Sequence, residues 1–328
     1  MRPRTRRTFL ALLPLLLPGG FLAQTEARRF IHVEWDLVGG VPPAMESELL
    51  RPLLLVADRR HCYVFDYGDH ALKAFDFEGV LKWHVGRSGH GPLEFTNPTD
   101  LQLDAEGNIW VLDPPNVRVT VVDPSGDVLS EIRLPRPFTR ILPVRGGDYW
   151  AFDNSERFWI RASQEGDSLD TPALPERLAR AEILAREPRV TTSARGTRGA
   201  LAFLYASPLF FLELASGAIR LVEAPESIEF PQTVQWTRNG VLYTRLDPKA
   251  PVAALSITSH ADKVYVLFNG RTEDRGRIVD VYSVLQGRYL RSYHLPESSL
   301  RIAMIDEGSV AALIVEPIPA IRIWRRME

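Results

Sequence analysis

The chain has 328 residues, of which 45% are hydrophobic, so it can bury a sizeable core. Its formal net charge of −2 at pH 7 gives no electrostatic reason to bind nucleic acid or anionic lipid, and we predict no nucleic-acid partner. The single cysteine, Cys62, cannot form an internal disulfide, and its position beside Tyr63 predicts a buried strand residue.

The first residues are typical of an export signal. Four arginines and no acidic residue precede the apolar run Leu12–Leu17, which is too short to span a bilayer. The pair Arg6-Arg7 resembles the twin-arginine type of signal, and a plain secretory signal is the alternative. We predict that residues 1–27 are removed, which takes away four arginines and one glutamate and leaves a net charge of −5. The mature chain is expected to be periplasmic or extracellular and to lack a transmembrane segment.

A repeated four-stranded unit is clearest around Trp110. A glycine-rich loop over residues 86–98 is followed by four short apolar segments separated by turn residues. Shifting Tyr63–Asp66 by 47 residues places it on Trp110–Asp113, and a further shift of 40 reaches Trp150–Asp153. Repeat lengths in the forties are typical of four-stranded propeller blades. A β-sandwich is the alternative, but a sandwich does not require aromatic, aspartate and glycine positions to recur together.

One segment departs from this β pattern. Residues 175–187 carry Glu and Arg four positions apart, with apolar residues on one face, which predicts a helix. The polar run 191–199 predicts a loop, and we place both in an insertion over residues 172–199, between the third and fourth units. The segment 225–251 predicts either an extension of the fourth unit or a small hairpin.

The last unit is one strand short, and the start of the mature chain offers a candidate for it. A fifth unit runs over residues 252–294, and a sixth offers three strands over residues 300–324. Apolar and polar residues alternate over residues 31–37, and this period of two predicts a strand. Pairing of residues 32–37 with the sixth unit would cover its open edge and close a ring, so residues 28–328 are expected to form a single domain.

Several segments resemble the NHL repeat of six-bladed β-propellers. They are Gly86-x-x-Gly89-x-Gly91-Pro92, Gly107-Asn-Ile-Trp-Val-x-Asp113 and Asp123-x-x-Gly126. The resemblance is most specific in the second unit and implies an all-β fold of six four-stranded antiparallel blades around a central channel. Many propellers of this group look like binding platforms, and a few look like enzymes. The resemblance therefore implies the fold more strongly than any activity.

Polar residues are predicted to gather at one mouth of the channel. Because successive antiparallel strands reverse direction, the loops from strand four to strand one and from strand two to strand three open on the same face. The candidate ligand-binding residues there are Asp66, Asp69, Arg87, His90, Asp113, Asn116, Asp153 and Arg157. The alternative role of the acids and the asparagine is turn stabilisation through backbone amides, and that of His90 is simple solvation.

These features predict an exported, non-catalytic propeller that binds a peptide, a glycan or an envelope protein on this face. The alternative is a metal-dependent hydrolase or lyase at the channel mouth. Its candidate ligands for a zinc or calcium ion are Asp66, His70, His90, Asp113 and Asp153. The NHL-like lyases that cleave an amidated glycine precursor are similar to this scaffold and use metal-bound histidines, but their ligand set finds no match here. Outside this alternative we predict no cofactor, and a purely structural role in an envelope assembly is a third hypothesis.

Overall fold

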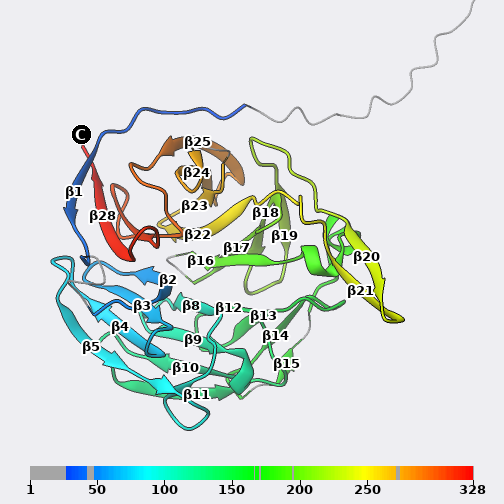
Figure 1. Ribbon diagram of the computed structural model, residues 1–328, viewed down its shortest axis with the longest axis horizontal. Coiled ribbons are helices and arrows are strands. Elements are labelled where there is room, and N and C mark those ends of the chain that lie inside the picture. Colours follow the sequence, from blue (N-terminus) through cyan, green and yellow to red (C-terminus); the bar gives the residue numbers. More distant parts are fainter. Residues whose placement is uncertain are drawn as a thin grey trace, which may run out of the picture.

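A computed structural model of the chain describes residues 27–42, 48–165, 167–169, 171–193, 196–270 and 274–327. These residues include six four-stranded antiparallel sheets, which are arranged as blades around a central channel (Figure 1). The predicted six-bladed β-propeller is therefore confirmed, and the β-sandwich alternative is wrong. The predicted export signal lies outside the described residues, apart from Ala27. In the described part of the chain, no helix is long and apolar enough to cross a membrane.

Blades one to three are formed by consecutive strands, from the channel outward. Blade one contains β2 (Pro52–Ala57), β3 (Cys62–Asp66), β4 (Ala71–Phe75) and β5 (Leu81–Val85). Blade two contains β8 (Asp100–Leu103), β9 (Ile109–Asp113), β10 (Arg118–Val122) and β11 (Val128–Arg133). Blade three contains β12 (Arg140–Pro143), β13 (Tyr149–Phe152), β14 (Trp159–Ala162) and β15 (Ser168–Leu169). The short strands β6 (Arg87–Ser88) and β7 (Glu94–Phe95) pair in the loop before blade two.

Blades four to six complete the ring. Blade four contains β16 (Pro188–Thr192), β17 (Arg198–Phe203), β18 (Ala206–Glu213) and β19 (Ile219–Val222). Blade five contains β22 (Ala254–His260), β23 (Lys263–Phe268), β24 (Ile278–Ser283) and β25 (Arg288–His294). Blade six contains β26 (Arg301–Met304), β27 (Ser309–Ile314), β28 (Ala320–Arg326) and, outermost, β1 (Trp35–Gly39).

The second strands of the blades are short apolar runs because both of their faces are covered. Every residue of β3, β9, β13 and β27 is buried. Tyr63 and Phe65 of blade one pack in one cluster with Ile109 and Val111 of blade two. Burial of this apolar surface between neighbouring blades is the main stabilising contribution to the ring. Cys62 is buried in the same way, as predicted.

The ring is closed by the predicted pairing of the two ends of the chain. Trp35 lies opposite Arg326 and Leu37 lies opposite Trp324 in an antiparallel ladder between β1 and β28. This covers the edge of β28, which would otherwise be an unpaired template for aggregation. The strand begins at Trp35, later than predicted, although the Glu34 carbonyl still accepts a hydrogen bond from the Met327 N–H at 2.9 Å. Just before the predicted strand, the Ile31 N–H donates to the Ser292 carbonyl of β25 at 2.9 Å.

The insertion before blade four is shorter and less helical than predicted. Among the described residues of the insertion, only α1 (Glu176–Ala179) and a single 3-10 turn over residues 183–185 are helical. Glu182 has an extended backbone conformation (φ −59°, ψ 136°), which ends the helical path despite the favourable Glu–Arg spacing. Residues 188–192, predicted to lie in the insertion, form β16 and thus the innermost strand of blade four.

The segment after blade four forms the hairpin that was one of the two predictions for it. It consists of β20 (Thr233–Arg238) and β21 (Val241–Leu246), which pair only with each other. Asn239 and Gly240 join them with φ angles of 52° and 76°, as a two-residue turn with both residues left-handed requires. The hairpin projects from the rim of the ring (Figure 1).

Candidate functional site: the central cavity

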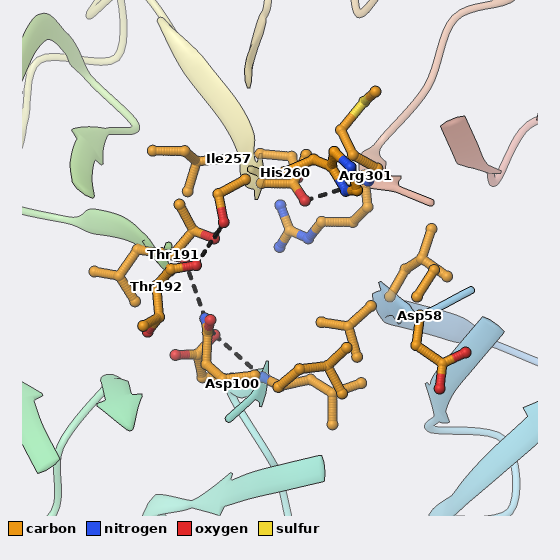
Figure 2. A pocket seen from close by; sticks show the side chains of 18 of the residues that line it. Asp58, Asp100, Thr191, Thr192, Ile257, His260 and Arg301 are labelled. Atoms are coloured by element: carbon orange, nitrogen blue, oxygen red, sulfur yellow. Dashed lines mark hydrogen bonds between the residues drawn. The ribbon is translucent and has the colours of Figure 1, made fainter. Parts of the chain in front are cut away.

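The central channel contains a cavity of about 500 Å³. Residues from the innermost strand of every blade line it, and Figure 2 shows the labelled ones arranged around one central opening. This volume lies within the range of roughly 300–1,000 Å³ that small-ligand pockets occupy. The cavity is therefore large enough for a small molecule or for the end of a longer ligand.

Charged residues occupy the start of four innermost strands. Asp100, Arg140 and Arg301 are the first residues of β8, β12 and β26, and Arg189 is the second residue of β16. Because the chain enters every blade from the same face, these positions lie at the same end of the channel. We refer to Arg140, Arg189 and Arg301 as the arginine floor of the cavity.

The three guanidinium groups of the arginine floor are connected through shared acceptors. The Glu187 carboxylate accepts a hydrogen bond from Arg189 Nη1 at 2.9 Å and lies 3.8 Å from Arg140 Nη2. The Leu255 carbonyl accepts hydrogen bonds from Arg189 Nε, at 3.2 Å, and from Arg301 Nη1. The floor thus spans blades three, four and six and holds three positive charges close together.

This crowding lowers the basicity of the arginines. Burial lowers the pKa of Arg301 to about 9, with further lowering by the positive charges of Arg189 and Arg140. The pKa of Arg140 is lowered to about 10, first by burial and then by Arg189. A positive charge is therefore less stable at the floor than in water. The negative charge of Asp100 offsets only part of the effect of burial and of the neighbouring arginines.

Asp100 and Gln102 form the side of the cavity contributed by blade two. The Asp100 carboxylate accepts hydrogen bonds from the Ile141 N–H at 2.9 Å and from Gln102 Nε2 at 3.1 Å. Gln102 Nε2 also donates to the Val190 carbonyl at 3.1 Å, so this side chain reaches from blade two to blade four. Burial raises the pKa of Asp100 to about 6, although Arg140 opposes the shift.

Hydroxyl groups line the middle of the cavity. The Ser259 hydroxyl donates to the Thr192 carbonyl at 2.5 Å and lies 3.4 Å from the Thr191 hydroxyl. The hydroxyl of Thr192 is buried and has no hydrogen-bond partner among the described residues. Because this hydroxyl is shielded from the cavity, the hydroxyl groups of Thr191 and Ser259 are the ones that a ligand is expected to contact.

The turns from first to second strands line the end of the cavity opposite the floor. Arg59 and Glu106 are exposed there, whereas Arg140 and Arg189 are buried and Arg301 is half-buried. We refer to these exposed residues, with Asp58 and His260, as the turn mouth. Burial lowers the pKa of His260, and Arg59 adds to this effect while Asp306 opposes it.

The aspartates predicted from the repeat lie behind the floor and hold loops in place. Asp66 accepts hydrogen bonds from the Leu50 and Arg51 N–H groups, both at 2.7 Å. Asp113 accepts hydrogen bonds from Thr96 and Asn97 at 2.9 and 3.0 Å. Each carboxylate thus fastens the loop that leads into its own blade, which is the turn-stabilising alternative raised from the sequence.

The other predicted residues also contact neighbours in their own blade or its loops. Their contacts are Asp153 with the Ser155 N–H at 2.9 Å and with Arg136, Asp69 with Lys73 at 2.7 Å, Arg87 with Glu94 at 2.8 Å, His90 with Asn116 at 2.6 Å, and the Arg157 carbonyl with the Trp159 N–H at 2.7 Å. Among the described residues, no hydrogen bond or ion pair joins the candidate residues of one blade to those of another.

The ligand set of the metal hypothesis is not assembled in the described part of the chain. No group of three or more His, Cys, Asp or Glu residues there has the arrangement that a metal ion requires. His70, a member of the predicted set, has a buried Nδ1 with no described partner. These residues therefore do not form the predicted centre in this structure.

The arginine floor itself was missed from the sequence. Its members are more than a hundred residues apart at the extremes, so no local motif contains them. One pattern points to them: a charged residue stands directly before an aliphatic one at the start of a short buried strand, as in Asp100-Leu101, Arg140-Ile141 and Arg301-Ile302. Once the strands are assigned, such residues can reach only the channel.

Comparisons with known proteins agree with the observed fold. A family model described as a 6-bladed beta-propeller matches residues 48–167. NHL repeat-containing protein 3 of Homo sapiens is 33% identical over 94 residues, which cover 25% of this chain and 26% of that protein. The chain thus spans about a quarter of the length of this curated relative.

Solved structures share the fold at low sequence identity. A member of the DUF4221 family from Bacteroides vulgatus has a TM-score of 0.59 at 9% identity, covering 90% of this chain and 99% of that one. Virginiamycin B lyase from Staphylococcus aureus has a TM-score of 0.52 at 14% identity, covering 90% of this chain and 100% of that one. A candidate exported protein of Bacteroides fragilis has a TM-score of 0.56 at 11% identity, covering 93% and 99%. These likenesses establish the fold alone.

Proposed function

Because the chain is a six-bladed β-propeller that resembles the NHL-repeat proteins, we propose that it is an exported, non-catalytic binding protein. Its ligand is part of a peptide, a glycan or a partner protein of the cell envelope. The predicted signal over residues 1–27 supports export to the periplasm or the extracellular space. The ligand enters the central cavity at the turn mouth.

The cavity is the observation that carries this proposal. It has a volume of about 500 Å³, its walls are formed mainly by strands with turn residues at the turn mouth, and it offers the hydroxyl groups of Thr191 and Ser259. Rigid walls lower the entropic cost of binding, and polar groups in the wall favour a ligand that can hydrogen-bond to them. The face predicted from the sequence offers less, since its aspartates already accept backbone hydrogen bonds.

The enzyme alternative receives no comparable support. The similarity to virginiamycin B lyase concerns the fold, at 14% identity. The residues named for a metal centre are not grouped in the described part of the chain. We therefore propose binding without catalysis.

Peptide and glycan arrays probed with the purified protein test this proposal. We expect binding to at least one class of array ligand, and loss of that binding in Ser259→Phe, because the larger side chain fills the middle of the cavity. His90→Ala is the matched control on the face predicted from the sequence. Binding that survives Ser259→Phe but disappears in His90→Ala would place the site on that other face instead.

A further inference from the structure

We infer that the arginine floor binds an oxyanion group, a carboxylate or a phosphate, carried by the ligand that enters the central cavity. This inference rests on the proposed binding function and names the chemistry that its ligand must present. Two features carry it: the balance of charges at the floor and the donors of Arg301 that no described residue occupies.

The floor has more positive than negative charges among the described residues. The three guanidinium groups face two carboxylates, those of Asp100 and Glu187. The Asp100 carboxylate accepts hydrogen bonds from the Ile141 N–H and from Gln102. Glu187 is shared between Arg140 and Arg189. Two carboxylates thus oppose three guanidinium groups, and among the described residues neither forms an ion pair with the third arginine.

Arg301 is that third arginine. Within the described residues it forms no ion pair, and its one recorded hydrogen bond goes to the Leu255 carbonyl. A guanidinium has five N–H donors, so most of the donors of Arg301 remain for a ligand. The planar arrangement of these donors matches the two oxygens of a carboxylate or a phosphate.

An oxyanion at the floor would remove an electrostatic cost that the empty site carries. Three like charges held close together in a partly dehydrated site repel one another, and burial strengthens this repulsion because screening by water is lost. A negative group between them turns repulsion into attraction. The fold holds the guanidinium groups in place through carbonyls and Glu187, so little rearrangement is needed for binding.

The walls above the floor restrict which oxyanion ligands fit. Thr191 and Ser259 provide hydroxyl groups, and Ile257 provides an apolar surface. No Phe, Tyr or Trp side chain belongs to the described lining, in which His260 is the one aromatic residue. The ligand is therefore expected to carry its oxyanion at one end, followed by hydrogen-bonding groups and a small aliphatic portion.

Calorimetric titration of the purified protein with succinate, inorganic phosphate and sulfate tests the inference, with neutral succinamide as the matched probe. We expect saturable binding of succinate or phosphate and none of succinamide. In Arg301→Gln the affinity should fall at least about tenfold, since a charge-assisted bidentate contact is lost. Arg60→Gln should change it less than about twofold, because Arg60 is exposed and does not line the cavity. Preference for succinate over phosphate would identify a carboxylate ligand, and the reverse order a phosphate.

Thermal melting of the ligand-free variants separates loss of binding from loss of folding. Arg301→Gln should melt at or above the wild-type temperature, because it removes repulsion within the floor. Arg189→Gln serves as a second variant if Arg301→Gln fails to fold. Full anion affinity in both variants, or no anion binding by the wild type, would overturn the inference. Array ligands that bind equally well to wild type and Arg301→Gln would leave the proposed function standing and refute only the oxyanion site.

Discussion

Two buried arginine sites in this propeller differ in how their charge is balanced. Arg28 lies against blade five, where its guanidinium contacts Asp280 at 3.0 Å and Glu226 at 2.6 Å and covers the ring of Phe268. Burial opposes the charge of Arg28, yet hydrogen bonds with the two acids raise its pKa. At the arginine floor, burial and neighbouring arginines lower the pKa of Arg301 to about 9.

The contrast separates a structural arginine from one available for binding. Both sites are partly or wholly removed from water, so burial alone does not distinguish them. The two sites differ in the number of carboxylates per guanidinium group. Two carboxylates surround the one guanidinium of Arg28, whereas two carboxylates lie among the three guanidinium groups of the arginine floor. An arginine that is paired with carboxylates stabilises the fold, whereas an arginine without such a partner is expected to attract an anion.

The largest effect is expected from removing the counterion of the structural site. Asp280→Asn leaves Arg28 buried beside Glu226 alone, and breaking a buried ion pair in this way typically costs about 3–5 kcal/mol of unfolding free energy. Urea denaturation measures the loss. The double variant Arg28→Met/Asp280→Leu is the control and should be less destabilised than Asp280→Asn. A loss below about 1 kcal/mol in the single variant would show that the two sites do not differ as argued.

The converse change supplies a counterion to the floor. Ser256 lies directly after Leu255 and contacts the first residues of β26, so Ser256→Asp places a carboxylate near Arg301. We expect sulfate affinity to fall at least about tenfold, because the new acid competes with the anion for the guanidinium groups. Ser256→Asn is the neutral control of equal size. Unchanged sulfate affinity in Ser256→Asp, measured by calorimetry, would contradict this prediction.

Sulfate binding is also expected to depend on pH through Asp100. The pKa of Asp100 is raised to about 6, so its carboxylate takes up a proton as the pH falls from 7.5 to 5.5 and the net positive charge of the floor increases. Sulfate affinity should therefore rise about two- to fivefold over this interval. The groups that face Asp100 are Arg140, Arg301, Gln102 and the N–H groups of Leu101 and Ile141, none of which titrates in this range.

Two variants test whether Asp100 causes the pH dependence of sulfate binding. Asp100→Asn should bind sulfate with nearly equal affinity at pH 5.5 and 7.5. His260→Gln, at the turn mouth, should keep the pH dependence of the wild type. Burial lowers the pKa of His260, so its imidazole becomes protonated only at a lower pH. If His260→Gln rather than Asp100→Asn abolishes the dependence, the anion binds near the turn mouth.

The smallest effect is expected on the face predicted from the sequence. His90 lies on an exposed loop, 2.6 Å from Asn116, and its removal breaks one exposed hydrogen bond. His90→Ala should lower the unfolding free energy by less than about 0.5 kcal/mol and leave sulfate affinity unchanged. Denaturation and calorimetry check the two statements. A clear loss of sulfate binding would restore this loop as a binding site.

The ring could be predicted from the sequence because its determinants are local. The recurrence of Asp66, Asp113 and Asp153 indicates the turn that follows each second strand, and the alternation over residues 31–37 indicates a strand, of which the structure has the part from Trp35. Blade four was predicted less well, because β16 carries Arg189, Thr191 and Thr192 and has the composition of a polar loop. Contacts around the channel, which are not local, make this segment a strand.

The site could not be predicted in the same way. Asp66 and Asp113 were recognised as acids near a channel mouth, but only the structure shows that backbone amides occupy their carboxylates. Arg140, Arg189 and Arg301 come from three different repeats and share no spacing. They meet because six innermost strands enter the channel in the same direction, a property of the closed ring and not of any one repeat.

The pairing of β1 with β28 also sets the order of events during synthesis. Residues 35–39 leave the ribosome long before their ladder partners over residues 323–326. The two strands must therefore find each other across the other five blades, a contact of high sequence separation that forms slowly. Until β28 has been synthesised, β1 has no partner strand and exposes an unpaired edge, so we expect the nascent chain to be most prone to aggregation in this interval.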